Sequence, residues 1–247
     1  MRRKVHVALG LLTLFVLCGC GSDRKGYVNV VSSDNLDFTA VAGGFTTPVH
    51  VVTLQMSPTE SGPDFTCPYL EYVLTTSGFF GYWHFPPYRD LLIRCQPQSA
   101  IAGTYSGTVR IKVSNVGYLY AEAVLPVQVE ILDAPSSPFP GFMKNSAQDI
   151  TYFDFVVPSG TPGLTTQTLE IVNQGGGTLN WSIVSNQPWL SVAPYQGDTT
   201  IETDVVNVNV NVAGLTSLTY YVGALTFACD SPYVAQEKIY VVLYVGN

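Results

Sequence analysis

The sequence contains few charged residues: Asp, Glu, Lys and Arg make up 12% of its 247 residues, about half of the ~25% that is usual for globular domains. Basic residues are the scarcest, with 11 Lys and Arg against 18 Asp and Glu. Nucleic acid binding depends on clustered basic side chains, so this shortage excludes a nucleic acid partner. Intrinsic disorder is excluded too, because disordered chains have few aromatic residues, whereas 12% of this sequence is aromatic.

Motifs of the common enzyme classes are also missing. Only His50 and His84 lie beyond the N-terminal leader, and neither has a cysteine or an acidic residue at the spacing of a metal site. There is no Gly-x-Ser-x-Gly elbow, P-loop or EF-hand loop. One group of acidic residues could gather around Ca²⁺ on a loop: Asp198, Glu202 and Asp204. We expect a protein that is not an enzyme and that uses no metal and no cofactor.

The N-terminus carries a short apolar run behind basic residues. Residues 2–4 are Arg-Arg-Lys, and the apolar stretch at 5–16 has the length found in signal peptides, shorter than the ~20 residues of a membrane-spanning helix. The stretch ends in Leu-Cys-Gly-Cys at 17–20, which resembles the lipobox of bacterial lipoproteins. The resemblance implies cleavage before Cys20 and acylation of that residue, and two or three acyl chains anchor a protein stably. The alternative is an ordinary secretory signal that is cleaved nearby.

Processing at this point would change the charge of the chain. The signal peptide, 1–19, holds three of the eleven basic residues and no acidic one, and a lipidated tether is expected at 20–33. The processed chain would have eight basic and 18 acidic residues, a net charge of −10. The two residues after Cys20 are Gly21 and Ser22, and neither is the Asp that usually retains lipoproteins in the inner membrane. The resemblance therefore implies a bacterial cell-envelope protein, in the outer membrane if the host has two membranes.

Alternation of apolar and polar residues is the main secondary-structure signal. It is clearest at 205–212, where valines alternate with asparagines, because a period of two places the valines on one face of a strand. Similar strands are expected at 49–56, 70–75, 91–95, 108–114, 123–132, 166–172, 179–184, 224–228 and 238–245. No segment has an apolar stripe of helical period longer than two turns. The sequence therefore predicts an all-β protein.

The two halves of the chain repeat one pattern. Residues 102–111 align without gaps with residues 218–227 and share a Tyr, a Gly two residues later and an alternating strand. The offset of roughly 109–117 residues between matching segments is the size of one β-sandwich domain. We therefore predict two tandem immunoglobulin-like sandwiches, at 34–132 and 148–247. The proline-rich linker between them, at 133–147, favours an extended, semi-rigid conformation.

The second half carries a more specific pattern. It contains Gly-Gly-Thr-Leu-Asn-Trp-Ser at 176–182 and Pro-Trp-Leu-Ser-Val at 188–192, followed by Pro194 and Gly197. Together with the alternating valines and Tyr221, this run resembles the BACON-type immunoglobulin-like domain, and the first half looks like a divergent copy. The resemblance implies an extracytoplasmic β-sandwich of a kind often attached to glycan-active enzymes or proteases. Glycan or mucin binding has been proposed for that family, and many copies are thought to be spacers.

Two tryptophans and two tyrosines of the repeat are expected to be structural. Trp181 stands where immunoglobulin-type sandwiches bury a tryptophan, and Trp189 belongs to the same core pattern. For both residues, core packing is favoured over stacking on a sugar ring. Tyr105 and Tyr221 each precede a strand at a corner that contains glycine. They are expected to close a backbone hydrogen bond, as in a tyrosine corner, rather than to contact a ligand.

One aromatic segment does not fit this structural pattern. Residues 79–88 read Phe-Phe-Gly-Tyr-Trp-His-Phe-Pro-Pro-Tyr. A strand with one buried face hides only alternate side chains, so some of these rings should be exposed, and clustered exposed aromatics mark binding surfaces. The alternative is packing against the insertion at 57–69 or against the second domain. The candidate ligand-binding residues are Tyr82, Trp83, Phe85 and Tyr88.

Three cysteines remain after processing: Cys67, Cys95 and Cys229. An oxidising compartment favours a disulfide between Cys67 and Cys95. In an immunoglobulin-type strand order, however, these positions lie at opposite ends of the sandwich unless the insertion doubles back, and a disulfide requires Cα atoms within ~7 Å. The sequence leaves this pairing open. Cys229 ends a strand and is expected to be a buried free thiol.

These features favour a non-enzymatic, lipid-anchored protein of the cell envelope that serves adhesion, display or spacing. The first alternative is a glycan-binding surface lipoprotein in which Tyr82, Trp83 and Tyr88 form a stacking platform. The second is a scaffold subunit of an envelope complex that pairs through β-strand edges. The expected partners are the membrane, through the lipid, and a glycan or an envelope protein.

Overall fold

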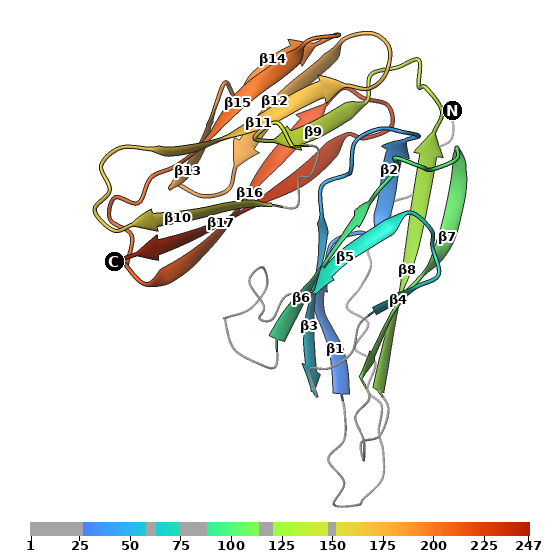
Figure 1. Cartoon of the computed structure of the whole chain (residues 1–247), viewed down its shortest axis with the longest axis horizontal. Coiled ribbons are helices and arrows are strands. Elements are labelled where there is room, and N and C mark those ends of the chain that lie inside the picture. Colours follow the sequence, from blue (N-terminus) through green and yellow to red (C-terminus); the bar gives the residue numbers. More distant parts are fainter. Residues whose placement is uncertain (1–26, 58–62, 75–87, 114–120, 148–151) are drawn as a thin grey trace, which may run out of the picture.

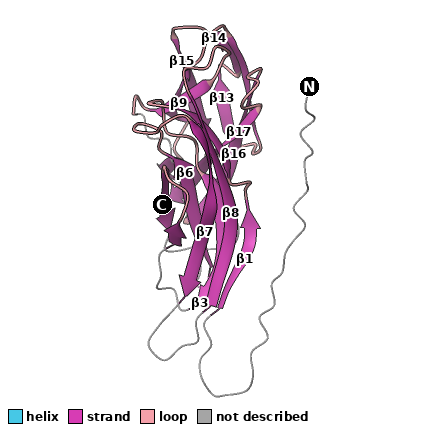
Figure 2. Cartoon of the chain, turned by 90° about the vertical axis from the view of Figure 1, so that its right-hand side faces the viewer, coloured by secondary structure: helices cyan, strands magenta, loops and turns pink. Residues whose placement is uncertain are grey.

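The computed structural model describes residues 27–57, 63–74, 88–113, 121–147 and 152–247. All regular secondary structure in these residues is β-strand (Figure 2). The strands form two sandwiches, one in each half of the chain, and the sandwiches meet at an angle (Figure 1). The prediction of an all-β, immunoglobulin-like tandem is therefore confirmed.

The first domain packs two four-stranded sheets face to face. One sheet has the strand order β1-β3-β6-β5 and the other the order β2-β8-β7-β4. β2 pairs in parallel with β8, and the other neighbours are antiparallel. The strands are β1 (Tyr27–Ser33), β2 (Asp37–Val41), β3 (His50–Ser57), β4 (Pro63–Phe65), β5 (Leu70–Leu74), β6 (Tyr88–Cys95), β7 (Gly103–Val113) and β8 (Ala121–Leu132). Apolar side chains from both sheets form one buried core, which includes Leu54, Leu91, Val109 and Val129.

The second domain repeats this plan with a five-stranded sheet, β10-β17-β16-β12-β14, and a four-stranded sheet, β13-β15-β11-β9. Here β10 pairs in parallel with β17. The strands are β9 (Pro140–Lys144), β10 (Phe153–Pro158), β11 (Thr165–Asn173), β12 (Leu179–Ser185), β13 (Leu190–Ala193), β14 (Gln196–Thr199), β15 (Thr203–Val210), β16 (Thr219–Cys229) and β17 (Gln236–Gly246). The core between the sheets includes Phe153, Trp181, Val208 and Phe227.

The valine–asparagine alternation lies in β15. Val206, Val208 and Val210 are buried in the core, whereas Asn207 is exposed. Asn209 is also buried, and its side-chain oxygen accepts a hydrogen bond of 2.7 Å from the Thr166 hydroxyl on neighbouring β11. Burying one valine side chain contributes ~1.5–3 kcal/mol. The period of two therefore fixes which face of β15 is turned to the core.

Two strands lie outside the domain boundaries expected from the sequence. β1, expected in the tether, pairs antiparallel with β3 and so belongs to the first domain. β9, expected in the linker, pairs with β11. Both are edge strands, and an edge strand can begin with a residue such as Pro140, whose missing N–H needs no partner. Polar and proline-containing edge strands give a weak alternation signal, which explains the difference.

The remainder of the linker is docked on the second domain. The Gly176 amide donates a hydrogen bond of 3.0 Å to the Pro135 carbonyl. A Cβ on Gly176 would lie 2.5 Å from the Ser136 carbonyl oxygen, and one on Gly175 would overlap that of Ser137. The glycine turn therefore allows the linker backbone to approach closely. In this structure the linker is a fixed part of the second domain.

Candidate functional site

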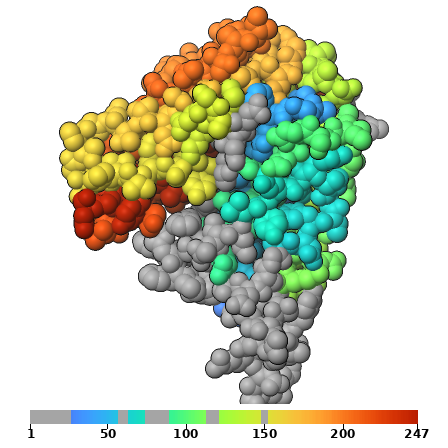
Figure 3. Space-filling view, in the orientation of Figure 1, coloured from blue at the N-terminus to red at the C-terminus, as the bar shows by residue number. Residues whose placement is uncertain are grey.

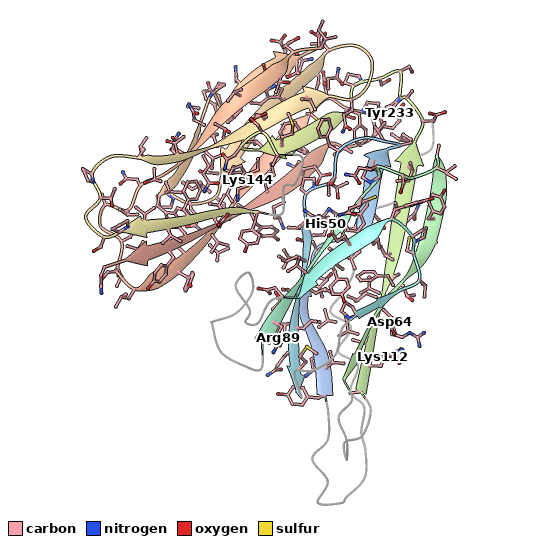
Figure 4. The ribbon with its side chains drawn as sticks, viewed as in Figure 1. His50, Asp64, Arg89, Lys112, Lys144 and Tyr233 are labelled. Carbon is pink, nitrogen blue, oxygen red and sulfur yellow. The ribbon has the colours of Figure 1, made fainter. Side chains whose placement is uncertain are left out.

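The two domains contact each other directly (Figure 3), and the contact contains two apolar clusters. One apolar cluster joins Val41 of the first domain to Phe139 and Val234 of the second. It includes Tyr233, whose position is labelled in Figure 4. A second cluster comprises Val49, Val51 and Leu92, with Tyr152 and Tyr240 packed against it. The joint therefore excludes water at two separate places.

A carboxylate of the first domain lies at the centre of the polar part of the joint. Asp34 accepts a hydrogen bond of 2.7 Å from Lys238 Nζ and one of 2.8 Å from the Tyr240 hydroxyl, both on β17. The Val51 amide donates a third bond of 2.9 Å. Burial by itself would raise the pKa of Asp34, but these donors and the Lys238 charge outweigh it and hold the pKa below its ordinary value. Asp34 is thus stabilised as an anion.

His50 occupies the neighbouring position in the joint (Figure 4). Its ring stacks on Phe38, with ring centroids 4.4 Å apart. The Nδ1 atom is hydrogen-bonded to the Asn35 carbonyl oxygen, and Nε2 lies 3.9 Å from the Glu237 carboxylate of the second domain. Burial by itself would lower the pKa of His50, but Glu237, the Asn35 carbonyl and Asp34 outweigh it and raise the pKa above its ordinary value.

Gln174 connects the domains at a third place. Its side-chain oxygen accepts a hydrogen bond of 2.8 Å from the Phe45 amide of the first domain. Its side-chain nitrogen donates to the Pro140 carbonyl at 3.1 Å. A Cβ on Gly141 would lie 2.6 Å from that nitrogen, so the glycine leaves the amide group its space. One side chain therefore binds the first domain and the start of β9 together.

An exposed apolar row lies on the outer face of the five-stranded sheet. Val156, Tyr244 and Tyr220 are register neighbours across β10, β17 and β16. Val156 is 76% exposed and Tyr220 41% exposed, and the two tyrosine rings have centroids 4.7 Å apart. These residues were not predicted as a surface feature from the sequence. In the sequence they alternate with buried residues of the same strands, and this alternation could have predicted their exposure.

The aromatic segment expected to bind a ligand lies largely outside the described residues. Tyr82, Trp83 and Phe85 are not among the residues that the structure describes. Tyr88 is the first residue of β6, and its backbone is paired with Gln55 of β3. The binding role of this segment therefore stays a prediction.

Trp181 lies in the core of the second domain and is 4% exposed. Its indole N–H is within 2.7 Å of a carboxylate oxygen of Asp204 and 3.1 Å of the Thr199 hydroxyl. Thr199 in turn donates to Asp204 at 2.6 Å. Asp204, which the sequence analysis considered as a calcium ligand, is thus engaged in holding the core tryptophan.

Trp189 lies in the core of the second domain, and Tyr105 and Tyr221 each bond to the backbone of a loop. Trp189 is buried in the same core and packs edge-on against Tyr221, with ring centroids 6.3 Å apart. The Tyr105 hydroxyl donates to the Ile101 carbonyl at 2.8 Å. The Tyr221 hydroxyl accepts a bond of 2.7 Å from the Thr216 amide. Each tyrosine therefore ties its strand to the loop that precedes it, which is the geometry of a tyrosine corner.

The three cysteines of the described residues are free thiols. Cys67 and Cys95 belong to the same core cluster, but the Cys67 thiol is directed at the Tyr105 carbonyl, 3.7 Å away. The disulfide that the sequence left open is therefore not formed in this structure. Burial, and secondarily Cys67, raises the pKa of Cys95 to about 12. Cys229 is partly buried and donates to the Val234 carbonyl at 3.0 Å.

The other acidic residues do not converge on a common centre. Glu202 accepts hydrogen bonds from the hydroxyl and the amide of Thr200, and these bonds lower its pKa to about 2. The described ranges contain no group of three or more His, Cys, Asp and Glu side chains that could hold a metal ion. Within the same ranges, no helix is long and apolar enough to span a membrane.

Two sandwiches in series, each with its last strand paired in parallel to its second strand, define a tandem immunoglobulin-like protein. Residues 149–232 match a family model described as a viral BACON domain, which confirms the BACON-type resemblance of the second half. Among curated proteins, none matches the chain.

Solved structures share the general fold at low similarity. One is a protein of unknown function from Porphyromonas gingivalis W83, with 14% identity and a TM-score of 0.35, which covers 88% of this chain and 99% of that one. The D0–D1 domain of intimin has 11% identity and a TM-score of 0.35, covering 90% and 99%. The Yersinia pseudotuberculosis adhesin InvE has 14% identity and a TM-score of 0.29, covering 88% and 59%. Similarity at this level carries no argument about function.

Proposed function

We propose that this is a non-enzymatic surface protein, anchored through a lipid on Cys20, that displays its second domain at a fixed distance and orientation from the membrane. The observation that carries this proposal is the joint. Gln174, the docked linker and two apolar clusters all connect the two sandwiches. A tandem held at several separate places extends as one body. The BACON-type second domain supports an extracytoplasmic location.

Display and spacing need no catalytic group, and two partly buried carboxylates of the chain have structural partners. Asp204 holds Trp181, and Asp34 holds Lys238 and Tyr240. Each of these carboxylates is engaged by neighbouring donors and stabilises structure. The glycan-binding alternative depends on Tyr82, Trp83 and Tyr88, and it remains a separate prediction.

Metabolic labelling with radioactive palmitate tests the anchor. The full chain should incorporate the label and sediment with membranes, and Cys20→Ala should lose both properties. Cys18→Ala is the matched control, because Cys18 belongs to the part of the leader that is removed. Label that persists in Cys20→Ala, or a wild-type chain that takes up no label, would refute lipid anchoring.

A further inference from the structure

His50 has an acceptor at each of its ring nitrogens. Nδ1 contacts the Asn35 carbonyl oxygen, and Nε2 faces the Glu237 carboxylate at 3.9 Å. A neutral imidazole carries only one N–H, so one of its nitrogens would present a lone pair to an acceptor. An imidazolium donates from both nitrogens. The arrangement is therefore complementary to the protonated ring.

The surroundings of His50 come from both domains. Only 18% of the His50 side chain and 14% of the Glu237 side chain are exposed, so solvent screens this pair less than a surface ion pair. Phe38 covers one face of the ring. The charged and titratable groups around it are Asp34 of the first domain, Glu237, Lys238 and Tyr240 of β17, and Asp90 of β6, which faces Tyr240.

Lys238 is the other cation in the joint, but its partner is Asp34 and not Glu237. Its ammonium group is bonded to Asp34 at 2.7 Å, and Tyr240 donates to the other oxygen of the same carboxylate. Asp34 is thereby occupied by donors of the second domain. Glu237 then faces His50 across the joint and is the anionic partner of the protonated ring. The joint thus contains two ion pairs side by side, one of which includes a histidine.

We propose that His50 and Glu237 form a pH-sensitive latch between the two sandwiches, closed while His50 carries a proton and weakened when the proton is lost. The direction of the pH dependence follows from the linkage between proton binding by His50 and closure of the joint. Because the pKa of His50 is raised in the closed joint, its contribution is complete below the ordinary value of 6.5 and is lost as the pH rises through the higher value of the closed state. Asp34, whose pKa is lowered, stays charged throughout this range. Mildly acidic surroundings therefore stiffen the tandem.

Two nuclear magnetic resonance measurements on the full chain test the latch. The first follows the His50 ring through a pH titration, where its midpoint should lie above 6.5 and should move down in Glu237→Gln. The second follows the protection factor of the Phe45 amide, which is bonded to Gln174 across the joint and reports its opening. This factor should fall several-fold between about pH 5.5 and about pH 8.5. In His50→Gln it should not depend on pH.

His84→Gln is the matched control, because it removes the other histidine beyond the leader and should leave both readouts unchanged. The amide of Val129, in the core of the first domain, serves as an internal reference. A His50 midpoint at or below 6.5 would overturn the proposal. So would a Phe45 protection factor whose pH dependence survives in His50→Gln. If His50→Gln does not fold, the shift of the His50 midpoint in Glu237→Gln decides the question.

Discussion

Gly197 lies so close to the ring of Trp181 that a Cβ in its place would come within 2.6 Å of the indole Cζ2 atom. The two residues are register partners on β14 and β12. The indole N–H of the same tryptophan is bonded to Asp204 and Thr199, so the ring cannot move aside without losing those bonds. Trp181 can therefore occupy this position only because residue 197 has no side chain.

Gly197→Ala should destabilise the second domain by about 1–3 kcal/mol, the usual cost of overpacking a filled core. Urea denaturation followed by tryptophan fluorescence measures the loss as a lower transition midpoint. Gly246→Ala is the matched control, since a Cβ there would have its nearest neighbour at 3.9 Å. Equal midpoints for Gly197→Ala and the wild type would mean that the ring shifts freely.

Gln174→Ala should loosen the joint and leave both sandwiches folded, because it removes the hydrogen bond to the Phe45 amide while both cores stay intact. Small-angle X-ray scattering should show a larger maximum dimension than that of the wild type. Gln167→Ala is a suitable control, since among the described residues Gln167 is bonded to Asn145 and Asp154, both of the second domain. A variant whose scattering matches the wild type would show that the apolar clusters alone fix the orientation.

Asp34→Asn should lower stability at neutral pH and have little effect in acid. The pKa of Asp34 is lowered in the folded protein, so its contribution is present above the ordinary value of 3.8 and is lost as the pH falls through the lower folded value. The loss near pH 7 should be on the order of 1 kcal/mol. Differential scanning calorimetry at about pH 7 and about pH 3 checks this. Asp37→Asn, at an exposed position nearby, should show no such difference, and a penalty for Asp34→Asn that is equal at both pH values would contradict the explanation.

The fold was predictable because its main signals are local. The valines of β15 alternate in the sequence as they do in the structure, and Trp181 lies in the core where the repeat pattern places it. A period of two needs no knowledge of distant residues. The edge strands β1 and β9 were missed because an edge strand is paired on one side only and tolerates proline and polar residues.

The joint was not predictable from the sequence. Asp34 and Lys238 are separated by 204 positions, and His50 and Glu237 by 187. The residues next to each of these four in the sequence do not indicate which distant residue it pairs with. Asp204 shows the same limit, because as one of several acidic residues in a loop it resembled a calcium ligand, and only the fold brings it to the indole of Trp181.

The parallel pairing of β10 with β17 determines how the second domain responds to tension along the chain. Tension that pulls the start of β10 and the end of β17 in opposite directions slides the two strands along each other, so their hydrogen bonds resist together. An antiparallel hairpin pulled at its two open ends would instead separate one bond at a time. β2 and β8 repeat this arrangement in the first domain. Both sandwiches are therefore built to withstand shear.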